Sequence, residues 1–283
     1  AYVVSTSVMD LLQAIDALDD VRLSGTKQED WYIQAAKDAM ADGDMLYAGK
    51  YNQPDYEKII SESCDLAIEN TMILHNPEVK EKLEALGIPV LVERSSYETH
   101  PLGRLEWIRL YGVLFGKEEQ ADAFYQEQVA KVEPIMKKDA TDQTMAFFYV
   151  TSNGSVNVRK PGDYIAKMIQ LAGGSYLPQA VKEDDENALS TMNMQMEDFY
   201  AQAKDADILI YNSTIEGELD SVDTLLAKSP LFADFKAVKE GKVYCTTADF
   251  FQETTGIASF IEDLHAVMTG DTSHELKYLK EVK

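Results

Sequence analysis

The stretch between residues 98 and 137 most constrains what this chain can fold into. It reads ETHPLGRLEWIRLYGVLFGKEEQADAFYQEQVAKVEPIMK. Pro101 suits a first helical turn, and apolar residues then recur at steps of three and four, which predicts an amphipathic helix. Gly116 ends that helix, and a second, polar helix follows from Lys117 to about Lys137. At 1.5 Å per residue, the second helix is about 30 Å long.

A long polar helix in mid-chain has two interpretations. It is a solvated spacer between two globular halves, or it is an ordinary surface helix of one large domain. The helix alone does not choose between them.

Short apolar segments alternate with helical patterns on both sides of this stretch. We expect strands at 2–5, 45–46, 66–68 and 89–92 in the first part, and at 145–150, 156–159, 208–211 and 243–246 in the second. Such alternation predicts parallel strands joined by crossover helices. The predicted fold class is α/β, with two Rossmann-like lobes joined by one long rigid helix and a ligand cleft between them. The expected boundaries are 1–116, 117–138 and 139–283, and we expect an acidic loop at 182–187.

Composition excludes several classes of protein. A chain of 283 residues suggests about two domains. The formal net charge of −23 argues against nucleic-acid binding, which requires a basic surface. No apolar run approaches the ~20 residues of a membrane span. Cys64 and Cys245 lie in different halves, so we expect neither a disulfide framework nor a C-x-x-C site.

The chain starts abruptly. Ala1 leads directly into a strand-like segment with no charged leader or apolar signal core ahead of it. We therefore expect a processed or trimmed product from which a signal segment is absent.

One short pattern occurs twice. Glu57 lies in Y-E-K-I-I, shortly before D-L-A-I at 65–68, and Glu197 lies in M-E-D-F-Y, shortly before D-I-L-I at 207–210. In both copies a glutamate opens a helix, where the helix dipole favours a carboxylate, and an aspartate opens the next strand. A single copy is an ordinary helix-terminal acid, whereas two copies at matching places indicate two related lobes.

These segments resemble the periplasmic-binding-protein-like family that delivers ferric siderophores, haem and cobalamin to ABC importers. Each lobe of that family carries E-x-I/L-x-x-x-x-P-D-L-V-I, and here Cys64 and Ala206 replace the two prolines. The segments G-I-P-V-L-V-E, L-Y-G-V-L-F-G-K-E and K-P-G-D-Y-I-A-K-M-I-Q-L-A-G-G follow in the order of the family. The resemblance covers nearly the whole chain.

The resemblance implies a carrier without catalytic residues or a resident cofactor. It implies that one ferric siderophore, haem or corrinoid is bound between the lobes of an extracytoplasmic monomer. The partners are an ABC permease and its ATPase, and the only link to the membrane is the permease or a lipid anchor. Glu57 and Glu197 would dock onto arginine pockets of the permease, because two separated carboxylates fix the register on a basic partner.

Ligand contacts are expected on loops at the carboxyl ends of strands. Basic residues stand out there because the chain has only 26 basic residues against 49 acidic ones, and they suit an anionic ferric chelate or haem propionates. Plain surface charges are the alternative. The predicted contacts are Tyr51, Asn70, Tyr97, His100, Arg104, Arg159, Lys160, Tyr211, Phe250 and Phe251.

The resemblance also bears on iron ligation. No direct metal site is expected, although Tyr51 matches the loop tyrosine that ligates iron in haem-binding members, and His100 is a second candidate. The alternatives are an aromatic wall for Tyr51 and a hydrogen-bonded turn for His100. We expect one of Phe250 and Phe251 to fill the core.

Two other classes of function remain open. The chain lacks the phosphate-loop, dinucleotide, zinc-protease and serine-hydrolase motifs. An enzyme or metal-insertion protein on the same two-lobed fold would need a bound cluster or an acid–base pair in the cleft, and Glu57 and Glu197 would be catalytic candidates if they converged there. A sensor or adhesion domain would have kept the fold and lost transport.

Overall fold

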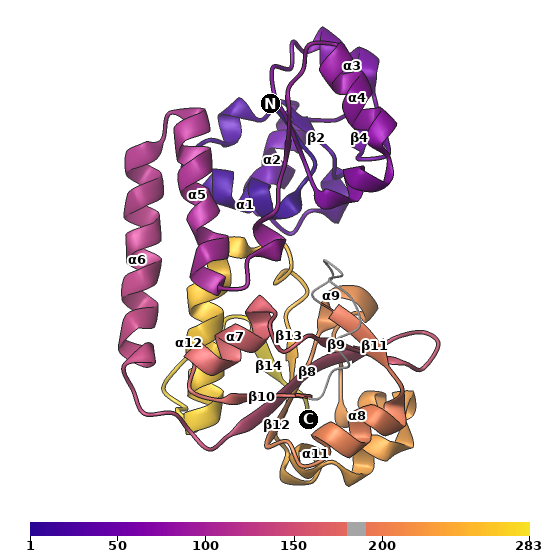
Figure 1. Ribbon diagram of the computed structural model, residues 1–283, viewed down its shortest axis with the longest axis vertical. Helices are drawn as coiled ribbons and strands as arrows, with labels where there is room; N and C mark the ends of the chain where they lie inside the picture. The colour runs from indigo at the N-terminus through magenta and orange to yellow at the C-terminus, as the bar shows by residue number, and fades with distance from the viewer. Residues whose placement is uncertain (180–190) are drawn as a thin grey trace. The chain divides into compact units, whose positions relative to one another are not determined.

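The computed structural model describes residues 1–179 and 191–283, and the chain forms two compact units (Figure 1). Unit 1 comprises Ala1–Ser96, Leu105–Gln126 and Phe251–Thr255. Unit 2 comprises Tyr97–Arg104, Glu127–Phe250 and Gly256–Lys283. The acidic loop predicted at 182–187 lies outside the described residues.

Unit 1 is built on a sheet of five strands in the order β3-β2-β1-β6-β7, and every pairing is parallel. Its strands are β1 (Tyr2–Val3), β2 (Leu23–Ser24), β3 (Leu46–Tyr47), β6 (Ala67–Glu69) and β7 (Val90–Val92). From β1 the chain moves outward to β3 on one side and then from β6 to β7 on the other. The direction of winding therefore reverses between β1 and β6.

Helices alternate with these strands, as predicted. They are α1 (Thr6–Ala14), α2 (Gln34–Asp42), α3 (Tyr56–Ser61), α4 (Pro77–Ala85) and α5 (Pro101–Phe115), with a hairpin of β4 (Gly49–Lys50) and β5 (Gln53–Pro54) ahead of α3. Local chemistry sets the helix ends: the Asp55 carboxylate accepts the Lys58 N–H at 3.0 Å, and Gly43 ends α2 in the left-handed region at φ 83°. One face of the sheet buries Tyr2, Leu23 and their neighbours against α3 and α4.

Unit 2 has a larger, mixed sheet in the order β11-β9-β8-β12-β13-β14, with β10 also paired to β8. Its strands are β8 (Thr144–Val150), β9 (Val156–Arg159), β10 (Ser175–Leu177), β11 (Thr191–Met194), β12 (Ile208–Tyr211), β13 (Val243–Thr246) and β14 (Leu279–Glu281). The pairings of β8 with β10 and β12, and of β12 with β13, are parallel. The remaining pairings, at the margins, are antiparallel. The predicted α/β class is confirmed, and the antiparallel margins are an addition to it.

The helices of unit 2 pack around an aromatic core. They are α7 (Tyr164–Leu171), α8 (Met196–Ala203), α9 (Ser213–Glu216), α10 (Val222–Lys228), α11 (Lys236–Glu240) and α12 (Ile257–Thr269). Phe148 and Phe199 have ring centroids 4.8 Å apart, and Phe232 lies 5.4 Å from Phe148 and 5.1 Å from Phe235. Clustered aromatic rings of this kind bury large apolar areas and fix one packing arrangement.

Two buried or half-buried aspartates join distant segments of unit 2. Asp207 accepts the Thr144 N–H at 2.7 Å and pairs with Lys236. Burial alone would raise the pKa of Asp207, but the hydrogen bonds from Lys236 and Thr144 outweigh that effect and lower the pKa. Asp263 on α12 is fully buried and accepts three backbone N–H groups and His274 Nε2, which fixes the C-terminal segment.

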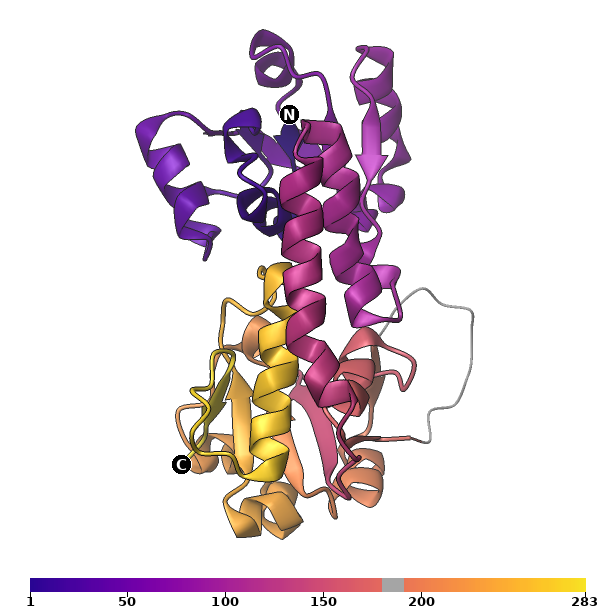
Figure 2. The same ribbon diagram turned by 90° about the vertical axis from the view of Figure 1, so that its left-hand side faces the viewer.

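The predicted long helix is α6 (Glu118–Met136), which begins in unit 1 and ends in unit 2 (Figure 2). Gly116, at φ 66°, ends α5 in the left-handed region, as the sequence indicated. A Cβ on Gly112 would lie only 2.6 Å from the Cβ of Ala121. The missing side chain therefore lets α5 and α6 pack closely in unit 1. The boundaries proposed at residues 116 and 138 stay a prediction.

Candidate functional site

A cavity of about 280 Å³ lies at the carboxyl ends of β1, β2 and β6 in unit 1. This is the side of the sheet where the winding direction reverses, and ligands of open α/β sheets bind at such a switch point. The cavity is lined by Val4, Ser5, Thr6, Gly25, Thr26, Asp30, Lys50, Tyr51 and Asn70. Hydroxyl, amide and charged groups predominate, so the cavity suits a polar part of a ligand.

Close backbone contacts shape this cavity. Gly25 follows β2, and a Cβ there would lie 2.9 Å from the Val4 Cα, so only glycine allows this approach. Gly49, at φ 89°, occupies a second such position in the β4–β5 hairpin. The buried Tyr2 hydroxyl donates to the Gly49 carbonyl at 2.8 Å. The hairpin that carries Lys50 and Tyr51 is therefore fixed to the core of unit 1.

A buried polar group supports the cavity wall at Ser5. The Ser5 hydroxyl lies 3.4 Å from Glu93 Oε2, and Glu93 Oε1 accepts the backbone N–H of Ser95. Glu93 and Ser95 are both buried. The residues after β1 and β7 are thus joined by hydrogen bonds behind the cavity.

Glu69, the last residue of β6, is an unusual neighbour of this site. It precedes the cavity residue Asn70, its side chain is fully buried, and neither carboxylate oxygen has a hydrogen-bond partner among the described residues. Burial raises the pKa of Glu69 to about 8. The side chain is therefore mostly protonated, and neutral, at pH 7.

Unit 2 holds a second candidate site, the Tyr164 stack, which consists of Arg104, Arg159 and Tyr164. The guanidinium carbons of Arg104 and Arg159 lie 4.4 Å and 5.6 Å from the centre of the Tyr164 ring. Arg159 also lies 3.8 Å from Asp163, which caps α7 by accepting the Ile165 N–H at 2.8 Å. Two guanidinium groups at one ring form a concentrated positive site on an otherwise acidic chain.

Burial has a limited effect on the charge of Arg159. Burial by itself lowers its pKa, but the neighbouring Tyr164 and Asp163 outweigh that effect and raise the pKa. The Tyr176 hydroxyl donates to the Arg159 carbonyl at 2.8 Å and fixes the backbone at the end of β9. Arg159 therefore stays charged in a defined position.

The predicted residues fall into three groups. Tyr51 and Asn70 line the unit 1 cavity, although Asn70 also accepts the Met72 N–H at 2.9 Å and so caps a short turn. Arg104 and Arg159 belong to the Tyr164 stack, and Lys160 directly follows Arg159 in the sequence. Tyr97 is 42% exposed in unit 2.

The third group of predicted residues lies in neither candidate site. His100 Nδ1 accepts the Leu102 N–H at 3.2 Å, as a turn residue does, and burial together with Lys167 lowers the pKa of His100. Tyr211 is fully buried in the core of unit 2, so its side chain is not presented to a ligand. Phe250 packs on Phe260 at 4.3 Å, whereas Phe251 is 43% exposed in unit 1.

Sequence reasoning missed several cavity residues, namely Ser5, Thr6, Thr26 and Asp30. Thr26 and Asp30 were missed because β2 was not predicted. Ser5 was counted as part of the first strand, although β1 ends at Val3 and Ser5 is the N-cap residue of α1. A small polar residue directly after a buried strand was the signal that could have located them.

The sequence profile of the periplasmic binding proteins matches residues 3–250, which is most of the chain. The chain belongs to the periplasmic binding protein family. This match covers both units and both carboxylate motifs.

Curated relatives of the chain include two uncharacterized lipoproteins of Methanocaldococcus jannaschii. They are 26% identical over 265 residues and 27% identical over 216 residues, which is 88% and 72% of this chain. These stretches make up 60% and 53% of the relatives' own lengths. The chain therefore spans little more than half the length of these two relatives.

Solved members of the family share the fold at low identity. A periplasmic haem-binding protein of Pseudomonas aeruginosa has a TM-score of 0.72 and 16% identity, over 99% of this chain and 94% of its own. An ABC-type Fe3+-hydroxamate transport protein of Saccharomonospora viridis has a TM-score of 0.69 and 18% identity, over 94% of this chain and 91% of its own. The periplasmic vitamin B12-binding protein of Vibrio cholerae has a TM-score of 0.66 and 13% identity, over 96% of this chain and 97% of its own. At these identities the likeness is one of fold.

The two glutamates of the repeated sequence pattern occupy equivalent local positions. Glu57 lies in the first turn of α3 and Glu197 in the first turn of α8, and both side chains are exposed. Their strand-opening partners differ: Asp207 bonds to Thr144 and Lys236, whereas Asp65 is exposed and lies 4.0 Å from the amino group of Ala1.

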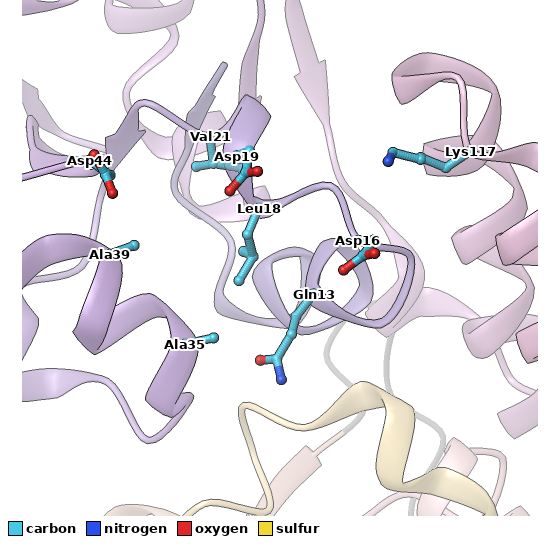
Figure 3. Close-up of a pocket in the computed structure, with 9 residues that line it drawn as sticks. All are labelled: Gln13, Asp16, Leu18, Asp19, Val21, Ala35, Ala39, Asp44 and Lys117. Atoms are coloured by element: carbon cyan, nitrogen blue, oxygen red, sulfur yellow. The ribbon is translucent and has the colours of Figure 1, made fainter. Parts of the chain in front are cut away.

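A larger hollow of about 750 Å³ lies elsewhere on unit 1, at the amino ends of β2 and β3. Figure 3 shows Gln13 and Asp16 entering it from the end of α1, Ala35 and Ala39 from α2, and Lys117 from the turn before α6. The other lining residues are Leu18, Asp19, Val21 and Asp44. The charged residues of its lining are three aspartates and one lysine. The hollow lies opposite the edge at which open α/β sheets bind ligands.

In residues 1–179 and 191–283, no three His, Cys, Asp or Glu side chains are grouped so that they could hold a metal ion. No helix within those ranges combines the length and apolar character that a membrane span needs.

Proposed function

We propose that this protein is the substrate-binding component of an ABC importer, and that it carries an iron chelate, haem or a corrinoid to its permease. Membership of the periplasmic binding protein family is the observation that carries the proposal. Family members bind substrates and are not enzymes, so the alternative of an enzyme or metal-insertion protein is not favoured. The fold neighbours named for haem, ferric hydroxamate and vitamin B12 set the classes of ligand to test.

Two local sites support ligand binding, one in each unit. The unit 1 cavity presents Lys50, Tyr51 and Asn70 on loops that the core holds in place. The Tyr164 stack presents Arg104 and Arg159. Cationic groups on an acidic protein favour an anionic ligand, because the surrounding surface repels anions elsewhere. Tyr51 remains the proposed iron ligand if the ligand is haem.

The exposed glutamates support a role in docking. Glu57 and Glu197 each combine a carboxylate with the start of a helix, and neither forms an ion pair with a described residue. We propose that they bind arginine residues of the permease, where charge pairs fix orientation more than they add affinity. An extracytoplasmic location, with a lipid anchor, is proposed because two curated relatives are named lipoproteins.

The proposal is tested by titrating the protein with haemin, a ferric tris-catecholate, a ferric trihydroxamate and cyanocobalamin, with tryptophan fluorescence as the readout. We expect one of them to bind, and Arg104→Gln to weaken that binding about 10- to 100-fold, since a charge-assisted hydrogen bond contributes about 1.5–3 kcal/mol.

Arg109→Gln is the matched control. Arg109 lies on the same helix but is paired with Glu106 and Asp122, so affinity should stay within about twofold of the unaltered protein. If all four probes fail to bind, the proposed function is wrong.

A further inference from the structure

Two large aromatic side chains of unit 1 are half-exposed and face each other. Tyr32 is 49% exposed and Phe251 is 43% exposed. Their ring centroids lie 5.9 Å apart with the planes at 83°, an edge-to-face arrangement. The two residues are far apart in sequence, so the pairing depends on a specific tertiary contact.

The buried side-chain amide of Gln252 joins the two segments that carry these rings. Gln252 is 1% exposed; its Oε1 accepts the Tyr32 N–H at 2.7 Å, and its Nε2 donates to the Asp30 carbonyl at 2.9 Å. Both hydrogen-bonding ends of one side chain are therefore used to hold Phe251 beside the segment 30–32. Asp30 is itself a wall of the unit 1 cavity.

A second contact fixes the other end of this segment. Thr255 donates its backbone N–H and its hydroxyl to the carboxylate of Asp10, at 2.7 Å and 3.1 Å. Asp10 is buried on α1, the helix that begins at the cavity. The segment Phe251–Thr255 is thus attached at two points to the elements that build the cavity, and the two rings are held rather than loosely placed.

Rigid aromatic side chains next to a polar cavity have a recognisable use. An ordered ring loses little conformational entropy when it binds, because it has few rotatable bonds and these are already restricted. An aromatic face or edge prefers another ring as its partner. Tyr32 and Phe251 leave such surfaces exposed.

We propose that Tyr32 and Phe251 form an aromatic rim beside the unit 1 cavity, and that this rim selects ligands that carry a flat conjugated ring. This inference rests on the proposed function and narrows its substrate class. A haem macrocycle or the catechol rings of a ferric chelate meets the requirement, whereas an aliphatic ferric trihydroxamate does not. The rim binds the ring, and the cavity accommodates a polar substituent.

The test compares Tyr32→Leu and Phe251→Leu with the unaltered protein in fluorescence titrations with haemin, a ferric tris-catecholate and an aliphatic ferric trihydroxamate. Leucine keeps apolar volume but removes the ring. We expect each variant to weaken the binding of the ring-bearing probe about 3- to 10-fold, the fold-change that corresponds to an aromatic pair worth about 0.5–1.5 kcal/mol.

Tyr125→Leu is the matched control, because Tyr125 belongs to unit 1 but its ring packs on Arg109 at 4.1 Å. The affinity of Tyr125→Leu for the ring-bearing probe should remain within twofold of that of the unaltered protein. Thermal melts of all three variants establish that they fold.

The possible outcomes separate the two proposals. The inference is overturned if the protein binds a ring-bearing probe and both rim variants bind it within twofold, or if the aliphatic chelate is the probe that binds. Binding of cyanocobalamin alone overturns this inference and leaves the proposed function standing. Failure of the unaltered protein to bind any of these three probes or cyanocobalamin overturns the proposed function and, with it, this inference.

Discussion

The chemistry of single residues is most unusual at Glu69. Its side chain is fully buried and has no hydrogen-bond partner among the described residues, so it favours the neutral form, because a charge in an apolar interior is costly. Burial is what raises its pKa to about 8. Burial and Glu69 also raise the pKa of Tyr2. The folded protein therefore binds a proton that the unfolded chain releases at neutral pH.

The raised pKa of Glu69 predicts how the stability of the protein depends on pH. The pKa of Glu69 is about 8 in the folded protein against 4.5 for an unperturbed carboxyl. The contribution of Glu69 to stability is therefore greatest below pH 4.5 and is lost as the pH rises through 8. Between pH 6 and pH 8.5 we expect the free energy of unfolding to fall by about 2–3 kcal/mol. Chemical denaturation across this range measures the effect.

Glu69→Gln is the matched test of this assignment. The amide stays neutral at every pH, so the decline should disappear, while Glu81→Gln on the exposed face of α4 should leave it in place. An unchanged decline in Glu69→Gln would contradict the assignment.

Residue roles were predictable where the sequence pattern fixes the environment. Arg159 was expected at the end of a strand, and β9 ends there. Tyr211 also ends a strand, but its side chain points to the buried face, and strand position alone does not reveal which face is covered. Phe250 and Phe251 are adjacent and chemically equal, and only tertiary packing distinguishes the half-buried ring of Phe250 from the exposed ring of Phe251.

At the scale of elements, the contact between α5 and α6 depends on Gly112 in unit 1. An added methyl at Gly112 would meet the Ala121 side chain at 2.6 Å and the Lys117 carbonyl at 3.2 Å. The helices would have to separate, because neither backbone nor a short alanine can move aside. Figures 1 and 2 both show these helices side by side.

Gly112→Ala should therefore destabilise the protein by about 1–3 kcal/mol, although alanine is the better helix former. Thermal or urea unfolding measures the change. The double variant Gly112→Ala with Ala121→Gly removes the opposing methyl and should recover part of the loss. A single variant as stable as the unaltered protein would show that the helices do not pack at this point.

Elements were predictable in proportion to their local signal. The helix pair around Gly116 was predicted almost to the residue, because proline, glycine and a regular apolar period all agree. The strand β2, which is Leu23–Ser24, was missed because two residues carry no period. The marginal strands β10, β11 and β14 were missed for a related reason. They are only three or four residues long, and their strand conformation depends on pairing with distant segments, which the local sequence does not reveal.

At the scale of the whole molecule, the alternation of strands and helices predicted two α/β units, and each unit has its own sheet. The units interleave along the chain, since Tyr97–Arg104 groups with unit 2 and Phe251–Thr255 with unit 1. A linear division could not anticipate this exchange, which depends on contacts such as those of Gln252. Both exchanged segments carry residues of the candidate sites, Arg104 and Phe251.

The proposed function requires that each chain binds one small molecule. Isothermal titration calorimetry of the full chain against haemin, a ferric tris-catecholate, a ferric trihydroxamate and cyanocobalamin measures this directly. We expect one of these probes to give a saturable isotherm with one ligand per chain and a dissociation constant in the micromolar range or tighter. Isotherms without saturable heat for all four probes would contradict the account.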